Sequence, residues 1–134
     1  MKYLFIVLCL LSAYSQAQTL NIPTDNNSIQ SGKKLFADHC SKCHEFGKQN
    51  IGPSLASITD KMPTSWLIAF IQNSQMVIRS GDPYAVFLYN EYNNMVMPEF
   101  PQLDNNQILD ILAYIKDTSL DKTYTADNDT IDAH

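Results

Sequence analysis

Cys40, Cys43 and His44 form the strongest chemical signal in the sequence, in the pattern Cys-x-x-Cys-His. On a helical turn, residues three apart share one face and the residue after them lies beside it. The two thiols can therefore add to the two vinyl groups along one edge of a haem, while the imidazole of His44 reaches the iron. This spacing is typical of c-type haem attachment. The motif predicts one covalently attached haem c.

Three other interpretations of the motif compete with haem attachment. A thioredoxin-like dithiol requires a βαβ pattern around Cys-x-x-Cys, and the sequence has none. A structural zinc site requires four ligands, but beyond the motif only His39 and His134 remain, and neither is placed to complete a tetrahedron. The third interpretation is a chance occurrence, which the helical context and the secretory signal predicted over residues 1–17 disfavour.

The first residues have the three parts of a secretory signal. Lys2 precedes an apolar run over residues 4–11, and the small residues Ser15 and Ala17 follow. The run is too short to cross a bilayer as a helix, which takes about 20 residues. We predict cleavage between Ala17 and Gln18 and a periplasmic location, with an uncleaved N-terminal anchor as the alternative. The mature chain is not expected to span a membrane.

Cleavage would leave 134 − 17 = 117 residues, enough for a single domain. A domain of about 90 residues has a marginal hydrophobic core, which a large buried cofactor would complete. Loss of Lys2 leaves 9 − 1 = 8 basic against 14 acidic side chains, a net charge of −6. Nucleic acid is disfavoured as a partner, because phosphate binding requires a basic surface. Cys9 leaves with the signal, and a disulfide across the short remaining Cys-x-x-Cys loop would add little stability.

Apolar spacing predicts a helix on either side of the haem motif. The first begins at Ser31 and runs into the motif, with Leu35 and Phe36 on its apolar side. The second covers residues 64–72, where apolar residues recur every three or four positions. Pro63 lies just before it, since proline cannot occupy a helix interior.

Two further helices are indicated by their N-terminal residues. Asp82 and Pro83 are typical of a helix start, with aspartate as the N-cap and proline at the first helical position. The last helix is predicted to start at Asp104, where Gln107 would complete a capping box. No strand pattern is present, so the sequence predicts an all-α fold of four or five short helices.

The predicted domain occupies residues 31–117. Residues 1–17 are the expected signal peptide. Residues 18–30 are polar and are predicted to form a flexible tether. Residues 118–134 are acidic and lack periodicity, so they are predicted to be a disordered tail.

Over roughly residues 29–117 the chain resembles the class I c-type cytochromes of the small bacterial kind. The matching segments occur in the family's order: Gly32-Lys33-Lys34-Leu35-Phe36, Cys40-x-x-Cys43-His44, Ile51-Gly52-Pro53-x-Leu55, Met97-Pro98-Glu99-Phe100, Leu103, and Ile111-Leu112-Ala113-Tyr114-Ile115-Lys116. The haem motif is highly specific, whereas the other segments are informative only in combination. The resemblance implies the cytochrome c fold, with helices wrapped around one covalently attached haem.

The resemblance also implies the two ligands of the haem iron. His44 would be the proximal ligand, with its other ring nitrogen donating to the carbonyl of Pro53, a bond that fixes the tautomer. Met97 would be the sixth ligand, because the family places proline directly after that methionine, and Met95 in the same loop is its rival. Methionine and histidine ligation raises the reduction potential. A filled sixth position favours electron transfer over catalysis.

Other residues have implied roles away from the iron. Gly32 and Phe36 resemble the family's contact points between the first and last helices, with Ile111 and Tyr114 opposite them. Trp66 either donates to a haem propionate or packs as an ordinary core aromatic, because a buried carboxylate requires hydrogen-bond partners.

The expected function is electron transfer rather than enzymatic catalysis. The protein would cycle between Fe(III) and Fe(II), exchanging electrons with a redox protein donor and acceptor such as a respiratory complex, a dehydrogenase or an oxidase. Two alternatives stay open: a dedicated electron-accepting subunit of one dehydrogenase, and an open-site haem protein that binds gas or acts like a peroxidase. Four lysines around the motif would either steer an acidic partner or form solvated helix faces: Lys33, Lys34, Lys42 and Lys48.

Overall fold

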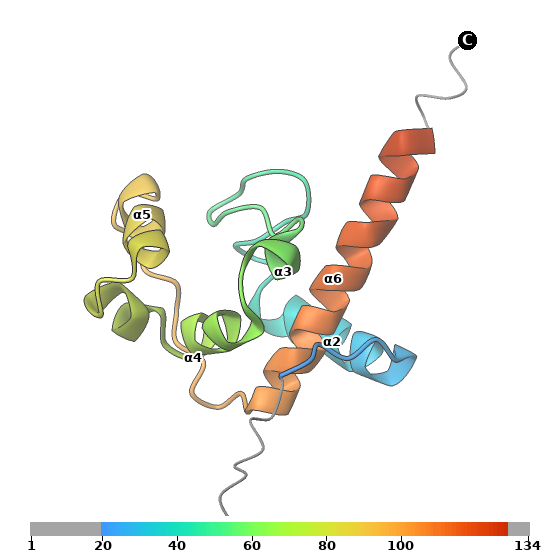
Figure 1. Ribbon diagram of the computed structural model, residues 1–134, viewed down its shortest axis with the longest axis horizontal. Helices are drawn as coiled ribbons and strands as arrows, with labels where there is room; N and C mark the ends of the chain where they lie inside the picture. The colour runs from blue at the N-terminus through green and yellow to red at the C-terminus, as the bar shows by residue number, and fades with distance from the viewer. Residues whose placement is uncertain (1–19, 129–134) are drawn as a thin grey trace, which may run out of the picture.

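The computed structural model describes residues 20–128, with side chains as far as Ser119; the predicted signal peptide and residues 129–134 lie outside this range. Within it the chain forms five helices and no strand (Figure 1). The helices are α2 (Asn26–His39), α3 (Ile58–Lys61), α4 (Thr64–Arg79), α5 (Pro83–Glu91) and α6 (Asn105–Asn128). The predicted all-α class is confirmed. No helix in the described range is long and apolar enough to cross a membrane.

The first and last described helices, α2 and α6, cross in close contact (Figure 1). The contact centres on Gly32, where a Cβ atom would overlap the backbone carbonyl of Asp110. Beside it the ring of Phe36 meets that of Tyr114 at 5.4 Å between centroids. The implied pairing of Gly32 and Phe36 with the last helix is therefore confirmed, and only glycine allows the two backbones to approach this closely.

The hydrophobic core lies between α2, α4 and α6 and includes one loop residue. Its buried members are Phe36, Leu67, Ile68, Leu103, Ile108, Ile111, Leu112 and Ile115. The members from α6 recur every three or four residues, which is the pattern of one buried helix face. This core fixes α4 and α6 relative to α2, and the haem motif directly follows α2.

Both predicted cap motifs are present. Asp82 caps α5 by accepting from the backbone N–H of Ala85 at 2.9 Å, with Pro83 at the first helical position. At α6, Asp104 accepts from the N–H of Gln107 at 2.9 Å, and the Gln107 side chain accepts in return from the N–H of Asp104 at 3.0 Å. This is the reciprocal capping box that the sequence predicts.

Helix α2 begins at Asn26, so the predicted start at Ser31 was wrong and residues 26–30 are helical rather than a tether. The cause is Asp25, whose carboxylate accepts from the N–H of Ser28 at 3.0 Å. This bond lowers the pKa of Asp25. An aspartate at the N-cap satisfies a backbone donor that would otherwise lack a partner, and it starts the helix ahead of the apolar pattern.

Helix α6 continues to Asn128, so the part of the predicted disordered tail before residue 129 is helical. Ser119 shows why the helix does not end near Asp117. It is buried at 7% exposure, and its hydroxyl donates to the Ile115 carbonyl at 2.7 Å. The same oxygen accepts from the N–H of Ser57 at 3.3 Å, so packing against the segment that leads into α3 extends the helix beyond its apolar periodicity.

Helix α4 begins at Thr64 as predicted but extends to Arg79, beyond the predicted end at residue 72. It is interrupted at Asn73, whose φ of −156° and ψ of 84° are extended rather than helical. The ribbon of α4 changes direction along its length (Figure 1). The apolar pattern thus predicted the first segment, and a second segment follows the break.

Candidate functional site

The haem motif forms a tight turn at the end of α2. Cys40 is the C-cap of the helix. Its carbonyl accepts from the N–H of Cys43 at 3.1 Å and from that of His44 at 3.0 Å. Both thiols are free and half-buried. The turn brings two thiols and one imidazole together on a stretch of five residues, 40–44.

The environment of Cys40 keeps its thiol protonated. Burial, together with a smaller contribution from repulsion by the neighbouring Cys43, raises its pKa to about 11. A thiolate is disfavoured in such a site because burial penalises the charged form. In the chain without a bound group, Cys40 is therefore a neutral thiol at pH 7.

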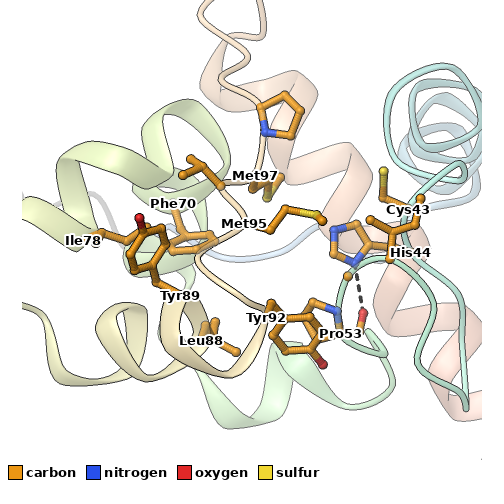
Figure 2. Close-up of a pocket in the computed structure, with 14 residues that line it drawn as sticks. Cys43, His44, Pro53, Phe70, Ile78, Leu88, Tyr89, Tyr92, Met95 and Met97 are labelled. Atoms are coloured by element: carbon orange, nitrogen blue, oxygen red, sulfur yellow. Dashed lines mark hydrogen bonds between the residues drawn. The ribbon is translucent and has the colours of Figure 1, made fainter.

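His44 has a fixed orientation. Its Nδ1 lies 2.9 Å from the carbonyl oxygen of Pro53 (Figure 2). A carbonyl only accepts, so Nδ1 carries the proton and the Nε2 lone pair is available for a metal. The loop is tied to the motif on both sides of Pro53, because Gly52 N–H donates to the Cys43 carbonyl at 2.8 Å and Leu55 N–H to the Glu45 carbonyl at 3.1 Å.

Gly52 allows this loop to pack against the imidazole. A Cβ atom at residue 52 would lie 2.5 Å from Cε1 and 2.9 Å from Nδ1 of His44. Any side chain at this position would push the ring away from the Pro53 carbonyl. Gly52 therefore helps to hold His44 although it donates no side-chain group.

Two apolar cavities adjoin the motif. One is lined by Cys43 and the other by Cys40. Five residues line both: His44, Pro53, Phe70, Leu88 and Met97. Because the two cavities share these walls, they form the two sides of one site that has a thiol at each side and the imidazole of His44 between them.

The lining of this site suits a large, flat, mostly apolar cofactor with a few polar atoms. The remaining walls are chiefly aliphatic and aromatic: Ile51, Ile78, Tyr89 and Tyr92 on one side, and Leu55, Ile58, Trp66 and Ile71 on the other. The indole Nε1 of Trp66 is buried without a partner among the described residues. A buried donor normally has an acceptor, and a bound group could supply one here. The residues therefore fit a haem.

Two methionines face the site from the loop after α5. Figure 2 shows the Met95 side chain extending toward the imidazole of His44, with Met97 beside it. Met95 is 54% exposed and lines one cavity, whereas Met97 is half-buried and lines both. Both candidates from the sequence are thus at the site, and Met97 is the one more enclosed by protein.

The segment after Met97 is fastened to α4. The hydroxyl of Ser74 donates to the Met97 carbonyl at 2.9 Å. Three residues further along, the N–H of Phe100 donates to the carbonyl of Gln72 at 3.3 Å. These two bonds join the loop to α4 on either side of the break at Asn73.

Other predictions concern groups away from the haem site. Among side chains of residues 20–119, no three His, Cys, Asp or Glu groups lie together as a metal site, so the zinc alternative lacks its ligand set in this range. His39 packs against Phe100 at the end of α2. Lys48 forms an ion pair with Glu45 at 2.9 Å, which offsets the charge of one of the four lysines around the haem motif.

The sequence did not reveal the roles of Gly52, Asn73 and Ser74. The segment containing Gly52 is one of those that resemble the class I cytochromes, and a glycine before proline indicates a tight loop. The contact of Gly52 with His44, however, depends on tertiary structure. Asn73 and Ser74 sit in a helical pattern. Asparagine and serine compete with the backbone for hydrogen bonds, and two adjacent ones are the only local sign of the break.

The comparisons with known proteins agree with this geometry. The family model for cytochrome c matches residues 29–119. The structure of cytochrome c from Rhodothermus marinus is similar at a TM-score of 0.68 and 25% identity, covering 75% of this chain and 84% of that chain. An engineered cytochrome c from the same organism, bound to a carbene intermediate, gives a TM-score of 0.63 at 25% identity, covering 74% and 83%. No curated protein matches the sequence.

Proposed function

The chain belongs to the cytochrome c family, and from this premise we propose that it is a periplasmic carrier of single electrons with His44 and Met97 as axial ligands of its haem. The resemblance to class I c-type cytochromes is confirmed by the family match and by the fold. Family and fold together support haem-based electron transfer through covalently attached haem c. The axial pair, the compartment and the partners are the proposed part.

The observation that carries the proposal is the pair of cavities that His44 and Met97 both line, with Cys43 in one and Cys40 in the other. Haem c, when bound, supplies one-electron exchange between Fe(III) and Fe(II). The two cysteines would hold it through thioethers. The Pro53 carbonyl keeps His44 in the tautomer that offers Nε2, and the apolar walls exclude water, which is a means of tuning the potential.

Met97 is preferred over Met95 because the fold holds its backbone in place. The Met97 carbonyl is bonded to Ser74 of α4. The bond of the Met95 N–H, in contrast, is to the carbonyl of Tyr92, three residues earlier in the same loop. A ligand whose backbone is anchored to a neighbouring helix loses less conformational freedom on binding the metal. Met97 therefore gains more from coordination than the exposed Met95.

A filled sixth position favours a carrier over an enzyme. With Met97 bound, oxygen and peroxide have no free coordination site, which is the argument against a gas-binding or peroxidase-like role. That open-site role is the second candidate, and the engineered relative bound to a carbene intermediate is the observation in its favour.

The proposed partners are redox proteins, one donor and one acceptor, met in the periplasm after export. The signal-like sequence of residues 1–17 supports export, as does the fact that class I c-type cytochromes are typically exported. A shuttle between two partners and a dedicated subunit of one dehydrogenase differ in how long the complex lasts. Co-purification with one dehydrogenase under mild conditions would favour the subunit.

The test uses protein made with a c-haem maturation system. Wild type, Met97→Ala and the matched variant Met95→Ala are compared by absorption spectra in both oxidation states, with haem staining of a denaturing gel. We expect haem on the denatured chain and a low-spin spectrum of the reduced protein. In the oxidised protein we expect a methionine-to-iron absorption band near the red end of the visible spectrum, lost in Met97→Ala and kept in Met95→Ala.

Each other result has a definite meaning. Absence of haem on the denatured chain would overturn covalent attachment through Cys40 and Cys43. Loss of the band in Met95→Ala alone would move the sixth ligand to Met95. A high-spin wild-type protein that binds carbon monoxide readily would replace electron transfer by the open-site function.

A further inference from the structure

Ser74 is a buried polar residue that the sequence gives no reason to single out. It is fully buried, at 0% exposure, in a helix whose other buried residues are apolar. Its hydroxyl donates to the Met97 carbonyl at 2.9 Å. A buried hydroxyl normally has a partner, but a serine could bond to its own helix, as Ser80 does by donating to Val77 at 2.7 Å. Ser74 instead reaches a segment 23 residues away.

The break in α4 puts Ser74 in the position from which it reaches this carbonyl. Asn73 has left the helical conformation, and its side chain accepts from the N–H of Met76 at 2.8 Å. Asn73 is thus the N-cap of a second helical segment, in the role that asparagine fills best. Ser74 is the first residue of that segment.

The same break provides a second anchor. Gln72, directly before it, accepts at its carbonyl from the N–H of Phe100 at 3.3 Å. The Gln72 side chain donates to that of Asn105, at the start of α6, at 3.0 Å. The segment from Met97 to Phe100 is therefore attached at both ends to α4, through Ser74 and Gln72 on either side of the break.

We propose that Ser74 is a positioning residue for the sixth ligand: its bond to the Met97 carbonyl, made possible by the break at Asn73, holds the thioether of Met97 in the haem site. The inference rests on the proposed function, in which Met97 binds the iron. It adds that a hydrogen bond from α4, rather than a contact within the loop itself, determines how strongly Met97 stays bound to the iron.

Loss of the hydroxyl should favour the form in which Met97 is detached. Ser74→Ala removes the donor. In the closed loop the Met97 carbonyl then lacks a hydrogen-bond partner, whereas in the open loop water can donate to it, so the closed form is destabilised relative to the open one. An external ligand binds only the open form, so its apparent affinity rises in proportion to the population of that form. We expect about a fivefold to tenfold gain in carbon monoxide affinity of the reduced protein, the size expected for one hydrogen bond.

The experiment titrates reduced holoprotein with carbon monoxide and records the methionine-to-iron band of the oxidised form and the reduction potential. Ser80→Ala is the matched control, because it removes a hydroxyl-to-carbonyl bond from the same helix at an exposed site. Ile108→Val is the stability control, since Ile108 is fully buried in the core but lines neither cavity, and losing a buried methylene lowers the free energy of unfolding. Ser74→Thr retains the hydroxyl.

We expect Ser74→Ala to weaken the band, lower the potential and raise the affinity, with Thr restoring all three toward wild type and both controls leaving them unchanged. The inference is overturned if wild type shows the band and Ser74→Ala matches it in band and affinity; the proposed function would then still hold. It is also overturned if Ile108→Val raises the affinity equally, since general destabilisation would then be the cause. A wild type without the band contradicts the proposed function itself.

Discussion

Two backbone carbonyls, those of Pro53 and Met97, control the proposed ligands at the residue scale. Pro53 accepts from the ring of His44 and fixes a side chain. Met97 accepts from Ser74 and has its own backbone fixed. In both cases the group that positions the ligand is a neutral hydrogen bond about 3 Å long. No charged side chain of the described residues takes part in either bond.

Gly52→Ala tests the contact between the loop and the imidazole. The new Cβ would approach Cε1 of His44 to 2.5 Å, so the ring and the Pro53 carbonyl must separate. We expect the holoprotein to lose about 1–3 kcal/mol of unfolding free energy, the usual cost of overpacking, measured by guanidinium unfolding. Gln49→Ala in the same loop is exposed and serves as the control. Equal stability of Gly52→Ala and wild type would contradict this account.

At the scale of elements, the contact between α2 and α6 depends on the absence of one side chain. Gly32→Ala has two opposing effects. Alanine favours a helix over glycine by about 0.5–1 kcal/mol, but its Cβ would overlap the Asp110 carbonyl, and a backbone cannot yield as a flexible side chain can. We expect a net loss of about 1–3 kcal/mol in chemical unfolding.

Ser31→Ala is the neighbouring control for Gly32→Ala, because Ser31 is exposed on the same helix and alanine there gains helix propensity without any contact. We expect Ser31→Ala to be neutral or slightly stabilising. If Gly32→Ala were as stable as Ser31→Ala, the two helices would have room to move apart without cost.

The elements also show which parts of the fold can be predicted from sequence. The starts of α4, α5 and α6 were predicted correctly because their signals, a proline or a cap residue, act within a few residues. The true start of α2, the continuation of α6 and the break in α4 were missed. Each of these features depends either on a cap residue that lies outside the apolar pattern, such as Asp25, or on a hydrogen bond between segments distant in the sequence, such as that of Ser119.

The candidate site divides in the same way. Its chemistry, at Cys40, Cys43 and His44, could be predicted because one short motif contains all three. The residues that orient that chemistry could not, because Gly52 and Ser74 act through contacts formed only in the folded chain. The choice between Met95 and Met97 rested on the family pattern, and it stays a prediction.

At the scale of the whole molecule, the two cavities show that the protein core is incomplete. Apolar walls from α4, α5, α6 and the loops face a space that the chain does not fill. Burial of apolar surface is the main stabilising term in folding, and a small domain has little of it to spare. The bound haem thus completes the core as well as carrying the electron.

We therefore expect protein produced without haem attachment to retain part of its helical circular dichroism but to lose the sharp thermal transition of the holoprotein. A chain that keeps secondary structure without fixed packing melts gradually. The comparison is a thermal melt of the two forms, followed by the negative ellipticity of helices at about 222 nm. A haem-free chain that melts as sharply as the holoprotein, at the same midpoint, would show that the core is complete on its own.

The contact of Gly32 with Asp110 joins positions 110 − 32 = 78 residues apart in the sequence. Contacts between such distant positions form late, because the loop between them must close first. A chain that is synthesised from its N-terminus has Cys40 and Cys43 in place long before α6 exists to cover α2. Until α6 packs on α2 the motif is part of an open chain, so both thiols are more accessible there than in the closed fold, where they are half-buried. The order of residues along the chain thus leaves Cys40 and Cys43 accessible ahead of closure.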